Sequence, residues 1–220
     1  MKSKQQGFTL VEIAIVLVII GLLLGGILKG QEMIVQAKIK NAMADFSGIS
    51  AAYHGYQDRY RSIPGDDRNA ATRWTTPTAA TAGDGNGIVA GTYNNAGAAC
   101  AASVEACSWW DHLRRAGFVA GNGADNPTNA FTGKIGVQTG DGGNTVATAL
   151  GGFAGLIVCS ANIPDKVAIA IDTQMDDGLI GTGTVRGQQQ TAPNPAINSA
   201  SSSSEYAETG TNVYTMCRAL

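Results

Sequence analysis

The sequence predicts an α+β fold in which one long N-terminal helix precedes a head of short strands, short helices and long loops. An apolar run occupies residues 7–28, and apolar residues then recur at helical spacing as far as residue 61. The rest of the 220-residue chain is rich in Gly, Ala, Thr, Asn and Ser, with short stretches of β-branched and aromatic residues. Roughly 160 residues follow the helix, which is enough for one globular domain with a core of its own.

The apolar run is long enough to cross a bilayer. At about 1.5 Å of rise per residue, residues 8–28 form a helix about 30 Å long, which matches the hydrocarbon core of a membrane. One carboxylate, Glu12, lies near the beginning of this segment. A charge within a membrane span costs about 2.5–3.5 kcal/mol on insertion scales, so we expect Glu12 to have a partner of opposite charge.

The helix is expected to continue beyond the membrane. After Gly30, apolar residues recur mostly at steps of three and four, with polar residues between them. This pattern predicts an amphipathic continuation over residues 29–61, and Ser62-Ile63-Pro64-Gly65 predicts its end. The apolar stripe consists of Ile34, Ile39, Ala42, Met43, Phe46, Ile49, Tyr53, Tyr56 and Tyr60. We expect this stripe to pack against the head rather than to stack on a ligand.

The residues before the apolar run are arranged unlike an ordinary secretory signal. They are short and basic, and no apolar stretch precedes the small residue Gly7. A cut after Gly7 therefore leaves the apolar run on the mature chain. This arrangement resembles the prepilin-type cleavage and methylation motif of the type IV pilin and type II secretion pseudopilin superfamily, a Gly followed by Phe-Thr-Leu-(Ile or Val)-Glu. All six positions are met, by Gly7, Phe8, Thr9, Leu10, Val11 and Glu12.

The resemblance implies how the chain is processed. A prepilin peptidase cuts between Gly7 and Phe8, Phe8 is N-methylated, and the subunit passes from the inner membrane into a helical filament. Glu12 then neutralises the N-terminal amine of a neighbouring subunit, which gives this acid its partner. A simple signal anchor with an incidental Glu is the alternative interpretation of the same segment.

The resemblance also implies a pilin-like fold, with the helix packed on a small antiparallel β-sheet. We expect a leader at residues 1–7, a transmembrane and filament-core helix at 8–28, its amphipathic continuation at 29–61 and a periplasmic head at 62–220. The implied location is the inner membrane, followed by an extracellular or periplasmic filament. The implied partners are homologous pilin or pseudopilin subunits, the prepilin peptidase and an inner-membrane assembly platform.

Short helices are predicted at three places in the head. Asp66 and Asp67 can cap a helical segment that ends at Trp74. Residues 103–118 form a plausible helix that Gly117 ends. Residues 164–176 have both the alternation of a strand and the spacing of a helix, and Pro164 in a first helical turn favours the helix.

Strands are predicted where β-branched and aromatic residues gather, at residues 134–138, 145–150, 154–159 and 212–217. The polar, low-complexity segment at residues 199–204 is expected to be an exposed loop before the final strand.

Four cysteines, Cys100, Cys107, Cys159 and Cys217, all lie beyond the apolar run. In an oxidising compartment an even count favours disulfides, and none of the spacings matches a zinc site. Three pairings are possible. We favour Cys100 with Cys107, closing a short loop, and Cys159 with Cys217, tying the last strand to a central one. The second pair resembles the disulfide that closes the C-terminal region of many pilins.

Two acidic loops offer oxygen ligands for calcium. Asp172, Asp176 and Asp177 precede Gly178 and partly match the ligand pattern of a calcium-binding loop. Residues 84–87 form a second such acidic loop. Neither has the distal bidentate Glu of an EF-hand. Some pseudopilins bind calcium in the C-terminal part of the head, whereas capped helix ends and tight turns are the alternative explanation for both loops.

The composition argues against other classes of function. A formal net charge of −2 and the lack of a basic stripe in the head mean that no nucleic acid is expected as a partner. The only histidines, His54 and His112, are expected to be surface or packing residues. No nucleophile elbow, phosphate-binding loop or His-Glu-x-x-His pair is present. We therefore expect no enzymatic activity and no cofactor other than the possible calcium.

The function favoured by the sequence is that of a structural subunit of a type IV pilus or pilus-like filament. A pseudopilin of a type II secretion system is the close alternative, because both carry the same N-terminal motif. A membrane-tethered enzyme is a minor alternative.

Overall fold

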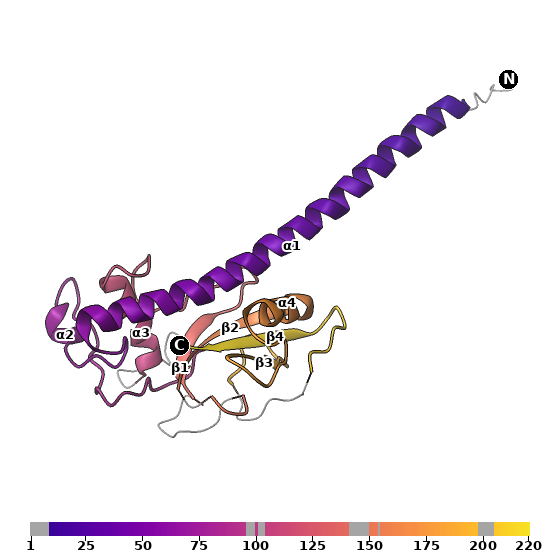
Figure 1. Cartoon of the computed structure of the whole chain (residues 1–220). Helices are drawn as coiled ribbons and strands as arrows, with labels where there is room; N and C mark the ends of the chain where they lie inside the picture. Colours follow the sequence, from indigo (N-terminus) through magenta and orange to yellow (C-terminus); the bar gives the residue numbers. More distant parts are fainter. Residues whose placement is uncertain (1–8, 96–99, 101–103, 141–149, 154, 198–204) are drawn as a thin grey trace. The chain divides into compact units, whose positions relative to one another are not determined.

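The computed structural model describes residues 9–95, 100, 104–140, 150–153, 155–197 and 205–220. In chain order its elements are α1 (Leu10–Tyr60), α2 (Ala70–Arg73), α3 (Glu105–Arg115), β1 (Ile135–Thr139), β2 (Leu156–Pro164), α4 (Asp165–Met175), β3 (Val185–Gln189) and β4 (Val213–Ala219) (Figure 1). They fall into two compact units, Met1–Lys38 and Ile39–Leu220, and the second is here called the head unit.

Helix α1 is one α-helix of 51 residues that contributes to both units. Its large apolar side chains between residues 10 and 35 are exposed, including Ile34 at 58%. From Ile39 onward one face is buried at helical spacing, by Ile39, Ala42, Phe46, Ile49, Ala52, Tyr53 and Tyr56. The predicted amphipathic stripe is therefore confirmed from Ile39, and the expectation that Ile34 packs in the same core is wrong.

The four strands form one antiparallel sheet in the order β1-β2-β4-β3. The central pair, β2 and β4, places Cys159 opposite Cys217, and its register shifts between Ser160 and Ile163. Strand β4 therefore lies between β2 and β3, although it comes last in the chain. This sheet, with α1 packed on it, is the pilin-like α+β arrangement that the sequence predicts.

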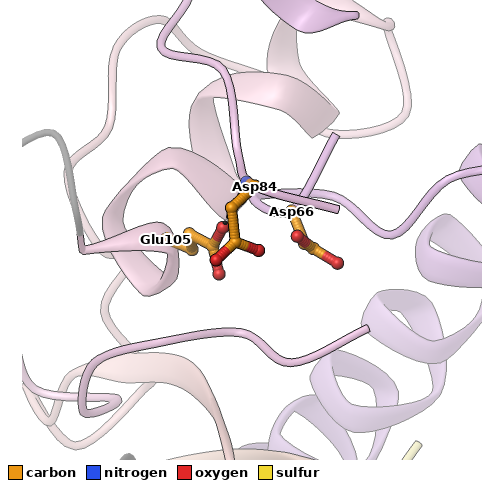
Figure 2. Close-up of side chains that lie close together, drawn as sticks. All are labelled: Asp66, Asp84 and Glu105. Atoms are coloured by element: carbon orange, nitrogen blue, oxygen red, sulfur yellow. Dashed lines mark hydrogen bonds between the residues drawn. The ribbon is translucent and has the colours of Figure 1, made fainter. Parts of the chain in front are cut away.

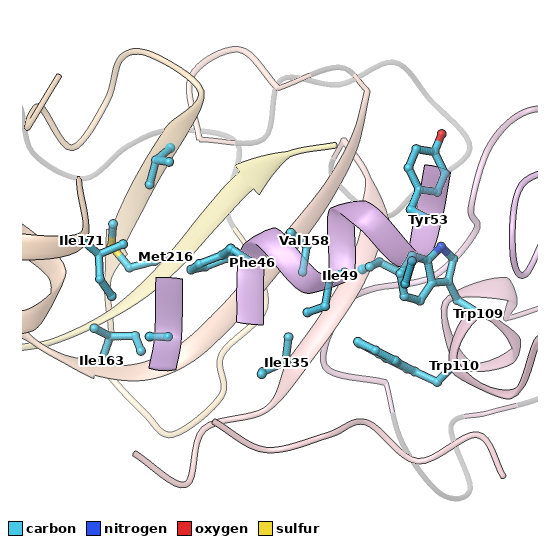
Figure 3. Packing of buried hydrophobic residues seen from close by; sticks show 14 of the residues in the cluster. Phe46, Ile49, Tyr53, Trp109, Trp110, Ile135, Val158, Ile163, Ile171 and Met216 are labelled. Atoms are coloured by element: carbon cyan, nitrogen blue, oxygen red, sulfur yellow. The ribbon is translucent and has the colours of Figure 1, made fainter. Parts of the chain in front are cut away.

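The buried face of α1 shares one apolar core with the sheet and with helices α3 and α4. Figure 3 shows Phe46 and Ile49 of α1 in one cluster with Met216 of β4 and Val158 of β2. These side chains are almost fully buried, and burial of one such side chain contributes about 1.5–3 kcal/mol. The amphipathic half of α1 is therefore an integral part of the head unit.

The head contains the three helices expected from its sequence, with shorter bounds. Helix α3 occupies the middle of the predicted segment, and Gly117 follows it with φ of 81°, a conformation in which glycine is favoured. Helix α4 confirms the helical interpretation of residues 164–176. The predicted cap of α2 is wrong, because its N-cap residue is Asn69 and no side chain caps the helix there.

Three of the four predicted strands correspond to β1, β2 and β4, with bounds shifted by one to five residues. Most of the fourth, at residues 145–150, and the expected loop at 199–204 lie outside the described residues. Strand β3 was not predicted, because Val185 is its only large apolar residue.

Both favoured disulfides are present in the structure. Cys100 is bonded to Cys107, seven residues later, beside the first turn of α3. Cys159 is bonded to Cys217 between the central strands β2 and β4. Both sulfurs of the second pair lie in a small buried cluster that also contains Tyr93, Ile157 and Ile197. This disulfide therefore fixes the middle of the sheet.

Candidate functional site

The polar groups at the beginning of α1 form a reciprocal pair between Thr9 and Glu12. The backbone N–H and the hydroxyl of Thr9 both donate to Glu12 Oε2 at 2.8 Å, and the Glu12 N–H donates to Thr9 Oγ1 at 3.3 Å. A Thr-x-x-Glu pair that exchanges these contacts is a capping box, which satisfies backbone donors at a helix N-terminus. The acid that the motif requires therefore also caps its own helix, a role that the Thr-x-x-Glu spacing could have revealed.

The capping contacts hold the Glu12 carboxylate at the N-terminal end of the helix. The positive end of the helix dipole lies there, and it favours an acid in the first turn. Gly7 and Phe8, the residues expected to flank the cleavage site, lie outside the described residues. The carboxylate is exposed, and among the described residues Thr9 is the donor of its hydrogen bonds.

The apolar surface that follows Glu12 has the length and composition of a membrane span. Among the described helices, α1 alone is long and apolar enough to cross a membrane, and no part of its most apolar stretch is buried. Leu10 is 91% exposed and Leu22 is 73% exposed, whereas soluble proteins seldom expose apolar patches of this extent. A surface of this kind is expected to contact lipid or other apolar helices.

The expected calcium residues Asp172, Asp176 and Asp177 lie close together at the end of α4, with carboxylate oxygens within 4.8 Å of one another. Each already accepts hydrogen bonds. Asp172 accepts from the Tyr206 hydroxyl at 2.5 Å and from the Gly178 N–H at 3.2 Å. Asp177 accepts from the Leu179 N–H in the following loop at 2.9 Å, and Asp176 accepts from the N–H of Val185, the first residue of β3, at 2.8 Å. The cluster therefore forms the turn after α4, and calcium binding there stays a prediction.

Burial strongly affects Asp172, whose side chain is inaccessible to solvent. It raises the pKa of Asp172 to about 6, and the charges of Asp177 and Asp176 act in the same direction, against the hydrogen bonds from Tyr206 and Gly178. Asp172 is therefore partly protonated in mildly acidic conditions.

A second acidic cluster contains Asp66, Asp84 and Glu105, which Figure 2 shows side by side. Asp66 accepts hydrogen bonds from the N–H groups of Gly85, Asn86 and Gly87. Glu105 accepts from the N–H groups at the two ends of the same loop, Asp84 and Ala90, both at 3.0 Å. The two buried acids thus hold the loop at residues 84–90 from both sides.

Glu105 was not recognised as a partner of this loop, because 21 residues separate it from Asp84. Burial raises the pKa of Glu105, and Asp66 and Asp84 act in the same direction.

His112 is a packing residue, as expected. Its side chain is fully buried, Nδ1 accepts from the Gly65 N–H at 2.9 Å, and Nε2 lies 2.8 Å from the Thr81 carbonyl. These partners fit a neutral imidazole with its proton on Nε2, and burial lowers the pKa of His112. The ring therefore joins α3 to the chain after α1 and has no nitrogen free for proton transfer, whereas His54 lies exposed on α1.

The comparison with known protein families agrees with the N-terminal geometry. Residues 2–28 match the model of the prokaryotic N-terminal methylation motif, which is the N-terminus of type IV pilins and pseudopilins. No curated protein and no solved structure matches the chain. The motif implies processing by a prepilin peptidase and assembly with pilin subunits, and proteins that carry it are typically structural rather than enzymatic. The chain thus resembles type IV pilins and pseudopilins in its N-terminal motif at residues 2–28, in its exposed apolar helix and in the pilin-like α+β fold of its described residues.

Proposed function

We propose that this protein is a structural subunit of a type IV pilus or pilus-like filament. A prepilin peptidase removes residues 1–7, Phe8 becomes the methylated N-terminus, and the subunit assembles through the first half of α1. The observation that carries the proposal is the match of residues 2–28 to the methylation motif, in which Glu12 is the only acid of the apolar segment. The exposed apolar surface after Glu12 supports it, because a filament core covers such a surface.

Glu12 has a specific role in this proposal. Before assembly its carboxylate caps α1 through Thr9. Cleavage after Gly7 creates an α-amine on Phe8, two residues before the first residue of α1. The same amine on a neighbouring copy provides the counter-charge that Glu12 needs in an apolar core. The subunit is held in the inner membrane until it leaves for the filament.

The test is replacement of Glu12 in the native organism. We expect Glu12→Gln to be processed normally and to keep its head folded but to be lost from filaments. Glu32→Gln is the matched control, because Glu32 is an acid on the same helix that is 60% exposed and pairs with Lys29. Mass spectrometry of purified filaments gives both the N-terminus and the amount of subunit. A filament subunit that still begins at Met1, or a Glu12→Gln subunit that assembles normally, would contradict the proposal.

The pseudopilin alternative shares the motif and the helix, so a different readout separates it. Deletion of the gene for a pilus subunit removes surface filaments that contain this chain. In a strain that lacks the gene for a pseudopilin, an enzyme that is normally secreted instead stays inside the cell.

A further inference from the structure

The head unit has an apolar groove along α1. It has a volume of about 300 Å³. Its lining includes Gly48 and Ile49 of α1, Trp110 of α3, Phe118 of the segment after α3, and Ile135 of β1. An added Cβ at Gly48 would meet no atom within 4 Å, so the floor of the groove is open at this residue. The groove thus offers space and apolar walls for a side chain from outside the head unit.

Among the described residues that line this groove, Asp45 is the only charged one. It is partly buried, and it makes no hydrogen bond or ion pair with any other described residue. Burial raises the pKa of Asp45, with no donor to offset it. A carboxylate that loses solvent without gaining a partner is unfavourable, so the groove is electrostatically incomplete and fits a cation.

The same chain carries a segment with the complementary features. Met33, Ile34 and Val35 of α1 lie beyond the predicted membrane span and are 64%, 58% and 42% exposed. Lys40 follows Met33 by seven residues, so the two lie on the same face of the helix about 10 Å apart. Lys40 is exposed and makes no ion pair with a described residue. This segment presents apolar side chains next to a free cation.

We propose that the groove receives residues 33–40 of a second copy of this chain, with Met33 against the apolar walls and the Lys40 ammonium beside Asp45. The inference rests on the proposed filament function and adds the contact that joins neighbouring subunits outside the membrane span. The groove and the segment are different surfaces of one chain. A contact between different surfaces is heterologous, and repeated without closure it generates a helical polymer rather than a closed dimer.

The size of the contact also fits a filament. Three apolar side chains and one ion pair bury far less than the roughly 1,200–2,000 Å² of a stable binary complex. Such a contact is effective when other contacts already hold the copies together, because the second binding event is then intramolecular. It is therefore expected within filaments and not between isolated subunits.

The test is cysteine cross-linking between two differently tagged copies expressed together. One copy carries Met33→Cys, and the other carries Gly48→Cys, a substitution for which the structure has room. The four native cysteines are already bonded to one another and do not compete. We expect a disulfide that joins the two tags in sheared filaments. Ser47→Cys in place of Gly48→Cys is the control, because Ser47 is exposed and outside the groove lining.

Charge exchange tests the ionic part of the contact. Asp45→Lys and Lys40→Asp are each expected to lower the yield of the Met33–Gly48 cross-link about tenfold, and the two changes together in every copy are expected to restore it. Retained resistance of the head unit to protease shows that each variant is folded.

The outcomes separate the inference from the function on which it rests. Filaments that contain the chain but give no cross-link between the tags, or a cross-link to a different protein, overturn the contact and leave the filament function standing. Unchanged yields after the single charge exchanges also overturn it. Absence of the chain from every filament overturns both.

Discussion

The hydroxyl of Tyr56 on α1 donates a 2.7 Å hydrogen bond to Oδ2 of Asp67, the oxygen that also accepts from Arg73 Nη1 at 2.6 Å. All of the Asp67 side chain is buried. Burial alone would favour its protonated form, but the hydrogen bonds from Arg73, Tyr56 and the Asn69 N–H hold the pKa of Asp67 below its usual range. The hydrogen bond between Tyr56 and Asp67 therefore connects the end of α1 to the segment that follows it.

Replacing Tyr56 by Phe is expected to destabilise the head unit. The change removes one donor from a buried carboxylate, and a hydrogen bond to a charged group contributes about 1.5–3 kcal/mol. Urea unfolding of the purified protein in detergent, followed by the fluorescence of buried Trp109 and Trp110, measures the loss. Tyr53→Phe is the matched control, because that hydroxyl accepts only a neutral amide hydrogen bond from Gln57. Equal effects of the two changes would show that the charge of Asp67 is unimportant.

Asp172 predicts a pH dependence of stability. The pKa of Asp172 is about 6 in the folded chain and about 3.9 for an unfolded Asp, so the folded state binds more protons between these values. The free energy of unfolding therefore falls as pH rises from about 4 to 6, by up to about 3 kcal/mol from this group. Asp172→Asn is expected to remove that slope.

The comparison between the wild-type protein and Asp172→Asn isolates this group from others that titrate nearby. Glu105, whose pKa is also raised, contributes a slope of the same sign. His112, whose pKa is lowered, contributes stability that is lost as pH falls below about 6.5. Identical unfolding curves for both proteins at pH 4, 5, 6 and 7 would refute the role assigned to Asp172.

The two disulfides are expected to contribute unequally. A chain-entropy estimate gives about 4 kcal/mol for the loop between Cys159 and Cys217 and about 2.5 kcal/mol for the shorter loop between Cys100 and Cys107. Replacing each pair by alanine and measuring urea unfolding tests the order. A greater loss from the Cys100–Cys107 pair would mean that strain or residual structure in the unfolded chain decides the effect.

The calcium hypothesis has a direct test. If the carboxylates of Asp172, Asp176 and Asp177 bind the ion, a calcium concentration of 100 times Kd stabilises the head unit by about 2.7 kcal/mol. The increase is expected to disappear in Asp177→Asn. Unfolding midpoints that do not change with added calcium would leave these acids with only the turn-forming role that their hydrogen bonds define.

Local sequence patterns were sufficient for most of the secondary structure. Helix α4 follows from Pro164 and the spacing of Val167 and Ile171, because these features concern neighbouring residues. Strand β3 could not be predicted in this way. Gly187 is conformationally weak for a strand, but it lies against Ile180, Met216 and Tyr206, so its place depends on packing with distant residues.

The candidate site also combines features that neighbouring residues predict with features that depend on distant residues. The six motif positions were readable from the N-terminal segment alone, and so was the Thr-x-x-Glu capping box that was overlooked. The assembly role of Glu12 stays a prediction. The loop held by Asp66 and Glu105 was not readable, because those acids come from segments about 40 residues apart and meet only after α3 has packed. The cap predicted at Asp66 and Asp67 failed for the same reason. The Asp66 carboxylate accepts from the loop at residues 85–87, and Asp67 Oδ2 accepts from Tyr56 and Arg73.

Strand β4 gives the sheet an order of completion. Because residues 213–219 occupy a central position between β2 and β3, neither neighbour has its full set of backbone partners until this segment has joined the sheet. A chain interrupted before residue 213 leaves β3 without the strand that it pairs with and leaves one edge of β2 open. Open strand edges are templates for pairing with other chains, so truncation at this point exposes the protein to aggregation.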